Sequence, residues 1–222
     1  MIEPKAYLVV SRYKEDVSWI KNLTSKYIIY NKGEKLPDSY NQICLPNFGA
    51  NQYDIFHFIY ENYDNLPDLM AFVQGDPFDH CLIERFNKLI YNEDFTLLFG
   101  DRTYPDGNLN GVPYWEPNNS WYINEPWNRH KPKCRFLDFN DYINHIFEDY
   151  ADVEINGERV ISFPPGSQII VEKERCLFYS KNFWKKLMDS ICDVEGMNGG
   201  REAHIIERSI KIIFENKFKE RL

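Results

Sequence analysis

The sequence predicts an α/β fold with a mostly parallel central sheet, formed as a single domain. Short apolar runs rich in β-branched residues alternate with segments of helical periodicity over residues 6–91, and this order is typical of parallel strands joined by helices. The chain has 222 residues, of which 43% are hydrophobic and 16% aromatic, so it can bury one sizeable core. No internal repeat or linker divides it, and we expect one domain over residues 1–222.

The N-terminal part is expected to contain strands and helices in alternation. The expected strands are the apolar runs 6–10, 27–30 and 69–73. The expected helices, in which apolar residues recur at helical spacing, are 16–23, 51–63 and 81–91. Residues 36–48 contain two prolines and are expected to form a loop.

The C-terminal part begins with a long aromatic segment. Residues 100–132 are rich in Pro, Gly, Asn and Trp and show little periodicity, which favours a long loop. Its aromatic rings are suited either to packing the loop on the domain or to stacking on sugar and base faces. Beyond it we expect helices at 140–150, 182–192 and 201 to about 217, a hairpin over 153–161 with Asn156-Gly157 at its turn, and a strand at 167–171.

Composition excludes some classes of protein. The net charge of -8 argues against a nonspecific nucleic-acid binder, because such proteins neutralise phosphates with Lys and Arg. The five cysteines are scattered and form no CxxC pair, which favours reduced thiols in the cytoplasm over a disulfide framework or a zinc site. No apolar window is long enough for a membrane span, and the N-terminal run is too short for a signal peptide.

Two carboxylates and an imidazole follow the third expected strand. The segment reads Gln74-Gly75-Asp76-Pro-Phe-Asp79-His80, directly after the apolar run. Neighbouring carboxylates raise each other's pKa unless a cation lies between them, and oxygen ligands of this kind suit Mg²⁺ or Mn²⁺. A polar turn in which Asp79 caps the next helix would explain the same residues, so both interpretations stay open.

Polar side chains from three strand ends are expected to meet at one edge of the sheet, where open α/β sheets bind ligands. They are Ser11 and Arg12, Asn31 and Lys32, and the segment from Gln74 to His80. Arg12 and Lys32 could bind phosphate or sugar oxygens, or each could be a solvated surface charge. The sequence has no GxxxxGK[ST], no GxGxxG after the first strand and no GxSxG, which disfavours kinases, dehydrogenases and serine hydrolases.

A second acidic cluster lies in the segment GGREAHIIER, residues 199–208. Glu202 is expected in the first turn of a helix, where the helix dipole favours its ionised form. It could act as a general base, and His204 could complete a metal site with the first cluster. Surface ion pairs in an acidic first turn would account for the same residues.

Five blocks of the sequence resemble one family. They are VVSRYKEDVSWI (9–20), YNKG (30–33), ENYDNLPDLMAFVQGDPFDH (61–80), FPPGSQIIVEKE (163–174) and REAHIIERSIKIIF (201–214). The blocks are similar to a little-characterised domain family of fungi, plants, bacteria and large DNA viruses, which includes a chlorella-virus glycosyltransferase linked to capsid glycosylation. The resemblance covers nearly the whole chain in order.

The resemblance implies a GT-A-type glycosyltransferase. Its fold would be an α/β/α sandwich with a mixed central sheet, a Rossmann-like nucleotide-sugar-binding half over 1–99 and an acceptor-side half over 100–222. It would move a hexose-type sugar from a nucleotide sugar, with UDP as the nucleotide, to a glycan or protein-linked acceptor. It would depend on Mn²⁺ or Mg²⁺ and act in the cytoplasm, or in the host cytoplasm if viral.

The resemblance also implies roles for residues. Asp76 and Asp79 match the DxD-type metal element, although two residues separate them here instead of one, and His204 would be a third ligand. Glu202 would be the base that takes the acceptor proton. The nucleotide would be bound by Ser11, Arg12, Asn31, Lys32, Gln74 and Gly75.

One departure from the family pattern affects these roles. Relatives carry a Gly-Arg-Glu type sequence where this chain has Gly49-Ala50-Asn51. The function of those charged residues must be absent here or supplied by Gln52 or Asp54. Residues 163–168 and the Trp-rich loop would shape the acceptor side.

Two other functions fit the same residues. A nucleotidyltransferase or phosphoesterase would use the Asp76 and Asp79 metal without a sugar acceptor. A noncatalytic carbohydrate-binding module would instead use the aromatic segment as its binding platform.

Overall fold

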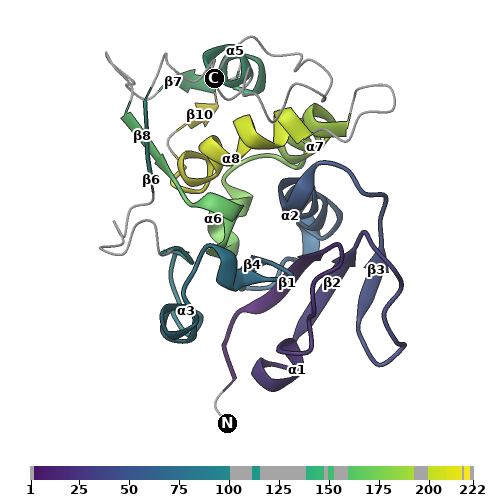
Figure 1. Cartoon of the computed structure of the whole chain (residues 1–222). Coiled ribbons are helices and arrows are strands. Elements are labelled where there is room, and N and C mark those ends of the chain that lie inside the picture. Colours follow the sequence, from purple (N-terminus) through teal and green to yellow (C-terminus); the bar gives the residue numbers. More distant parts are fainter. Residues whose placement is uncertain are drawn as a thin grey trace.

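A six-stranded sheet forms the centre of the molecule. The computed structural model describes residues 3–100, 112–115, 139–147, 150–152, 160–192, 200–216 and 218–220. The strand order is β3-β2-β1-β4-β9-β5. Figure 1 shows β3, β2, β1 and β4 side by side. The strands are β1 (Tyr7–Arg12), β2 (Tyr27–Asn31), β3 (Gln42–Cys44), β4 (Leu69–Gln74), β5 (Thr96–Leu97) and β9 (Ile169–Glu172). β1 to β4 pair in parallel and β9 runs antiparallel to β4 and β5, so the expected mostly parallel α/β sheet is confirmed.

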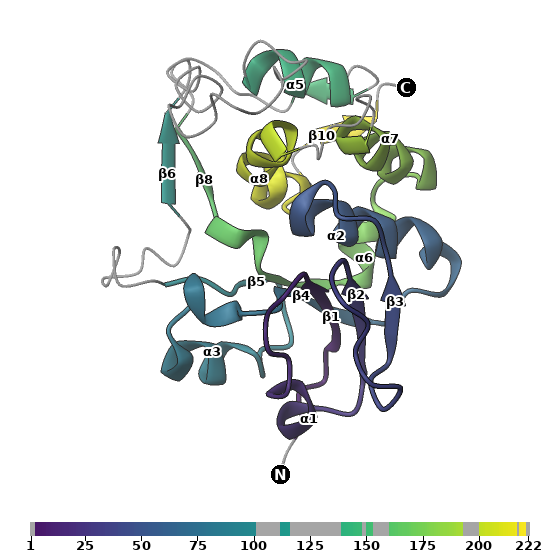
Figure 2. The same cartoon turned by 45° about the vertical axis from the view of Figure 1, so that its right-hand side comes forward.

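Helices cover both faces of this sheet. α1 (Ile20–Leu23) and α3 (Ile83–Leu89) lie on one face, while α2 (Ala50–Glu61), α7 (Lys181–Cys192) and α8 (Gly200–Phe214) lie on the other (Figures 1 and 2). Strands buried on both faces have continuous apolar sequences, which explains the unbroken runs in β1, β2 and β4. Residues 100–222 supply β9 as well as α7 and α8, so both halves of the chain build one sheet and its cover.

The core on the α2 side is mainly aromatic. Trp184 of α7 is fully buried and stacks on Phe214 of α8, with 5.5 Å between ring centroids. Its indole N–H donates to the carbonyl of Cys176, in α6 (Lys173–Leu177), at 2.9 Å. Phe56 of α2 contacts the same indole at 6.1 Å between centroids. These contacts fix α2, whose N-terminus reaches the edge of the sheet, against the C-terminal helices.

Smaller elements complete the described chain. β6 (Val112–Trp115) pairs with β8 (Val160–Phe163), and β7 (Tyr150–Asp152) pairs with β10 (Phe218–Glu220). α5 (Phe139–Ile146) lies beside α7 and α8. Short 3₁₀ turns are η1 (Tyr63–Asn65), η2 (Pro77–Asp79) and η4 (Pro165–Ser167). None of the helices in the described ranges has the length and apolar character that a membrane span requires.

Two predictions in the N-terminal part were wrong in detail. The expected helix 16–23 shortens to α1, because the Asp16 carboxylate accepts from the N–H and hydroxyl of Ser18, both at 2.9 Å, and holds a turn there. The expected loop 36–48 contains β3, which has only three residues and is therefore too short to give a period-2 signal.

The C-terminal predictions are met in part. α7 matches the expected helix 182–192 within one residue, and the last helix ends at Phe214 instead of about 217. Of the expected hairpin 153–161, residues 153–159 lie outside the described residues, and β8 pairs with β6. Of the expected loop 100–132, residues 101–111 and 116–132 lie outside them, while 112–115 form β6.

Candidate functional site

A pocket of about 260 Å³ lies at the carboxyl ends of β1, β2 and β4. The chain runs outward from β1 to β2 and β3 and then returns through α2 to β4 on the other side of β1. This reversal of strand order is where open α/β sheets bind ligands. Seven of the residues expected at this edge line the pocket: Ser11, Arg12, Lys32, Gln74, Asp76, Asp79 and His80. The expected convergence of strand ends is therefore found.

The side chains of each strand end divide between the two faces of the sheet. Successive residues of a strand point to opposite faces. Val9 belongs to the core under α2, and Ser11 follows it on that face, whereas Val10 belongs to the core under α1 and α3, with Arg12 on that side. The same alternation in β2 separates Lys32 from Asn31. Two polar networks result, one on each face.

The α2-side network consists of Ser11, Lys32 and Asp54. The Ser11 hydroxyl is hydrogen-bonded to Oδ2 of Asp54, and Lys32 Nζ lies 3.0 Å from Asp54 Oδ1. Lys32 Nζ also donates to the carbonyl of Phe48, at 3.0 Å, and to that of Ala50. Burial raises the pKa of Asp54 to about 6, against the opposing effects of the Lys32 charge and the Ser11 hydrogen bond. The Lys32 ammonium is thus directed into the protein.

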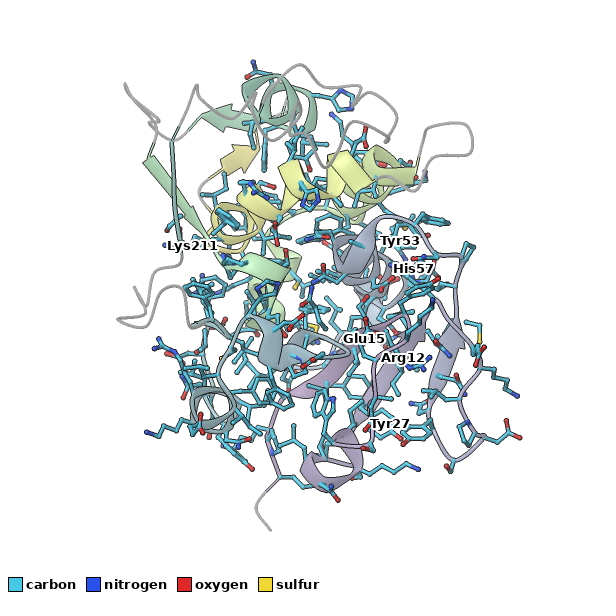
Figure 3. The ribbon with its side chains drawn as sticks, in the orientation of Figure 1. Arg12, Glu15, Tyr27, Tyr53, His57 and Lys211 are labelled. Carbon is cyan, nitrogen blue, oxygen red and sulfur yellow. The ribbon has the colours of Figure 1, made fainter. Side chains whose placement is uncertain are left out.

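The α1-side network begins with Arg12, which is held by backbone and amide oxygens. Its Nε donates at 2.9 Å to the carbonyl of Glu15, which Figure 3 labels next to Arg12. Its Nη1 donates to Asn31 Oδ1 at 2.7 Å and to the carbonyl of Glu34 at 3.0 Å. Arg12 also lines the pocket, and its Nη2 has no hydrogen-bond acceptor among the described residues. Arg12 therefore offers one edge of a fixed guanidinium to an anion.

Asn31 holds this arginine instead of facing the pocket. Its Oδ1 accepts from Arg12 and from the N–H of Gly33, at 3.1 Å. Its Nδ2 donates to the Glu34 carbonyl at 2.8 Å and to Gln42 Oε1 at 2.9 Å. The side-chain amide makes two bonds at each end and is 1% exposed. In this arrangement the Asn31 amide has no donor or acceptor position left for a ligand, and its contact with a nucleotide stays a prediction.

The two carboxylates after β4 are exposed at the pocket. Asp76 Oδ1 accepts from the N–H of Phe78 at 3.1 Å and caps η2, so Asp76 is the capping residue here and Asp79 is not. Both Asp76 and Asp79 line the pocket and are open to solvent. Mg²⁺ is commonly held by one or two carboxylates together with ligand oxygens, and this pair fits such a site.

Gly75 supports the pocket through its backbone. Its N–H donates to the Ser11 carbonyl at 2.7 Å, and its own carbonyl accepts from Trp19 Nε1 at 2.9 Å. A Cβ at this position would lie 2.9 Å from Glu15 Oε2, so the loop packs too closely for a side chain. Gly75 is not among the lining residues, and its role is the fit of the β4 end against the loop after β1.

The turn η4 forms a wall beside the pocket. A Cβ at Gly166, where φ is +75°, would lie 2.6 Å from Cδ2 of His80 and 3.0 Å from Oε1 of Gln74. Gln168 accepts from the N–H of Gln74 at 3.2 Å and donates to the carbonyl of Pro77 at 3.0 Å. Residues 163–168 were expected to shape the acceptor side, and the described structure shows this turn fixing the residues that follow β4.

Glu202 and His204 do not line this pocket. Both lie on α8, where Glu202 is 5% exposed and His204 Nδ1 is 4.0 Å from Oε2 of Glu207. Glu207 is the α8 residue that reaches the pocket wall, since its Oε1 accepts from the N–H of Gly166 at 2.6 Å. Glu202 precedes it by five residues, which turns its side chain about 140° around the helix axis.

The predicted three-residue metal site is not formed. Within the residues that the structure describes, no three His, Cys, Asp or Glu side chains are placed to share a metal ion. His204 is therefore not assembled with Asp76 and Asp79. The two exposed carboxylates alone fit a cation whose other ligands come from a bound phosphate and water.

Three residues of this region have structural roles that the sequence did not predict. Asp54 was considered only as a substitute for a missing charge, although an acidic residue beside Ile55 on the apolar face of a helix signals a buried charge. Gln168 and Glu207 gave no comparable signal. Their partners are the backbone groups of Gln74, Pro77 and Gly166, which only the folded chain brings near.

Comparison with known proteins gives a family and no activity. No curated protein and no solved structure matches the sequence. One family model, described as "Protein of unknown function (DUF3431)", matches residues 8–221. This match includes every strand end that builds the pocket as well as α8. The chain therefore belongs to the DUF3431 family.

Proposed function

We propose that this chain is a metal-dependent glycosyltransferase that moves a hexose-type sugar from a nucleotide sugar, with UDP as the nucleotide, to a glycan or protein-linked acceptor. The observation that carries the proposal is the pairing of a guanidinium edge with two exposed carboxylates in one pocket at the reversal of strand order. The transfer of a sugar follows from the resemblance of the five sequence blocks. Membership of the DUF3431 family does not indicate which reaction the protein catalyses.

The two charge types of the pocket suit a diphosphate leaving group. Arg12 presents donors that match phosphate oxygens, and its hydrogen bonds to Asn31 and to backbone oxygens hold it in place before a ligand arrives. Mg²⁺ or Mn²⁺ bound at Asp76 and Asp79 would stabilise the negative charge that grows on the departing diphosphate.

The acceptor hydroxyl must lose a proton when it attacks the anomeric carbon. Glu202 stays the predicted base, although its place on α8 is outside the pocket lining. Its involvement requires the acceptor to bind against α8. Exchange of Glu202 for Gln is expected to keep donor binding and to abolish transfer, and near-normal transfer in that variant would remove Glu202 from the mechanism.

The proposal is tested with a panel of nucleotide sugars and simple sugar acceptors in Mn²⁺, with separation of the products. The wild type should release UDP and either transfer or hydrolyse the sugar, and Asp76→Asn should lose this activity. Asp38→Asn is the matched control, because Asp38 is an exposed carboxylate that pairs with Lys35 and is not among the residues that line the pocket.

The same panel separates the main rival. A phosphoesterase or nucleotidyltransferase would use Asp76 and Asp79 to cleave a phosphodiester or pyrophosphate bond and would release UMP or a sugar phosphate. If these products form and no free UDP is released, the protein is a phosphoesterase or nucleotidyltransferase and the glycosyltransferase proposal is wrong. Glycan binding that persists in EDTA and in Asp76→Asn would favour a noncatalytic module.

A further inference from the structure

The α2-side network lies directly behind the pocket and has a feature that the proposed function does not use. We propose that the Asp54–Lys32 pair fixes the Ser11 hydroxyl as a hydrogen-bond acceptor, so that the pocket selects ligands that present an O–H or N–H group to Ser11. In this role Ser11 determines specificity and Asp54 is a positioning residue. The inference deepens the proposed function and rests on it, since it takes the ligand to be a nucleotide.

The first step is the charge of the pair. The oxygen atoms around Lys32 Nζ include the carbonyls of Phe48 and Ala50, to which it donates, and Asp54 Oδ1 at 3.0 Å. Carbonyl oxygens only accept, so the nitrogen donates to both of them, and beside the Asp54 carboxylate it carries the ammonium charge of an ion pair. Its buried positive charge needs a compensating charge, and the Asp54 carboxylate, 1% exposed, lies 3.0 Å away. The pair is therefore a cation and an anion.

The second step is the direction of the hydrogen bond between Ser11 and Asp54. A carboxylate has no proton to give, so the hydroxyl donates its single hydrogen to Asp54 Oδ2. Ser11 also lines the pocket, and among the described residues its Oγ has no other hydrogen-bond partner. Only the lone pairs of the Ser11 Oγ therefore remain available to a ligand in the pocket. Ser11 then accepts a hydrogen bond and cannot give one.

The third step is the chemistry of the ligand. A uridine nucleotide has two kinds of donor that could meet Ser11, the ribose hydroxyls and the imide N–H of the base. Cytidine carries an acceptor nitrogen in place of that imide, and a deoxyribose lacks one hydroxyl. A buried acceptor that meets another acceptor, or meets nothing, loses its hydrogen bond to water without replacement. The shared requirement is a donor, and the analogues reveal which group supplies it.

The test is the affinity of UDP, 2′-deoxy-UDP, 3′-deoxy-UDP and CDP in Mn²⁺, measured by calorimetry for the wild type and for Ser11→Ala. We expect the wild type to bind at least one analogue roughly threefold to tenfold more weakly than UDP, as one lost hydrogen bond predicts. In Ser11→Ala that ratio should fall to about one. A deficit with a deoxy analogue identifies the ribose as the donor, and a deficit with CDP identifies the base.

The role of Asp54 is tested in the double variant Lys32→Met/Asp54→Asn, which removes both charges together. An amide at position 54 can donate to Ser11 and release its hydroxyl hydrogen toward the pocket. The preference for UDP over the sensitive analogue should then disappear, while binding of inorganic pyrophosphate with Mn²⁺ stays within roughly threefold of the wild type. Ser11→Ala alone decides the matter if the double variant does not fold.

The outcomes separate this inference from the proposed function. If nucleotides bind and the analogue ratios are the same in Ser11→Ala as in the wild type, the inference about Ser11 is wrong and the proposed function stands. If all four nucleotides bind the wild type with equal affinity, the inference about Ser11 is again wrong and the proposed function stands. If neither UDP nor pyrophosphate binds the wild type in Mn²⁺, the proposed function fails first and the inference fails with it.

Discussion

The two polar networks that flank the end of β1 differ in where their hydrogen-bond donors point. On the α2 side, the Lys32 ammonium points into the interior, where it contacts Asp54 and the carbonyls of Phe48 and Ala50. On the α1 side, Asn31 and backbone oxygens hold one part of Arg12 and leave Nη2 for the pocket. The two cations follow adjacent strands and both line the pocket. Their surroundings, and not their charge, decide which one can bind an anion.

The largest effect is expected on the α2 side, in the pH dependence of stability. Burial raises the pKa of Asp54 to about 6 from 3.8, against the charge of Lys32 and with Tyr30 of β2 and Ser11 of β1 nearby. A raised pKa stabilises the fold below the unfolded value, and this contribution is lost as pH rises through about 6. Asp54→Asn lacks the effect. Its free energy of unfolding, minus that of the wild type, should rise by up to about 3 kcal/mol between about pH 4 and about pH 7.

Urea unfolding of both proteins across this pH range measures that difference. Using the difference cancels the titration of groups that do not contact Asp54, including Glu207, whose pKa is lowered by its hydrogen bonds and by Arg208 in spite of burial. A difference that is flat between these pH values would mean that folding does not raise the pKa of Asp54.

A comparable effect is expected on ligand binding, and only for one of the two cations. Arg12→Gln should weaken binding of Mn²⁺-pyrophosphate by roughly tenfold to a hundredfold, as the loss of a charged hydrogen bond predicts. Lys32→Met is the matched variant and should change the affinity by less than about threefold, because the ammonium points inward. Calorimetry on both folded variants checks this, and equal losses would show that the two networks do not differ in function.

A smaller effect is expected at Asn31, which joins Arg12 to the rest of the α1-side network. Asn31→Ala leaves the buried donors of Arg12 and Gly33 without their acceptor and should cost about 1–3 kcal/mol of unfolding free energy. It should also weaken pyrophosphate binding, because Arg12 is no longer held in place. Denaturant unfolding and calorimetry measure the two effects, and unchanged values for both would contradict the positioning role.

The smallest effect is expected at the wall formed by η4. Gly166→Ala places a Cβ 2.6 Å from His80 at a φ of +75° and should cost about 1–2 kcal/mol. The displaced His80 and Gln74 should also lower nucleotide affinity. If Gly166→Ala has the stability and the nucleotide affinity of the wild type, the backbone of η4 can shift without changing the pocket.

The sequence predicted which residues lie together at the pocket better than it predicted where their side chains point. Carboxyl ends of parallel strands share one edge, so identifying the strands was enough to bring Arg12, Lys32 and Asp76 to one pocket. Which of them faces the ligand depends on partners such as the carbonyl of Ala50, which only the folded chain supplies. The same limit explains Asn31, whose four hydrogen bonds come from residues near and far in sequence.

Residues placed by long-range packing were predicted least well. Glu202 was predicted as a base and His204 as a metal ligand, both from the acidic cluster and from the resemblance. Neither lines the pocket, and the Glu207 side chain of α8 accepts from the N–H of Gly166. The rotation of a helix about its axis is set by its whole apolar face, here including Ile206 and Ile210, which are fully buried. A motif within the helix does not reveal that rotation.

The most direct test of the account is calorimetric titration of UDP into the wild type and into Asp76→Asn, each in Mn²⁺ and in EDTA. We expect UDP to bind the wild type only in Mn²⁺, and we expect Asp76→Asn to lose that binding while it keeps the far-UV spectrum of the wild type. UDP binding of equal strength in EDTA, or full Mn²⁺-dependent binding in Asp76→Asn, would contradict it.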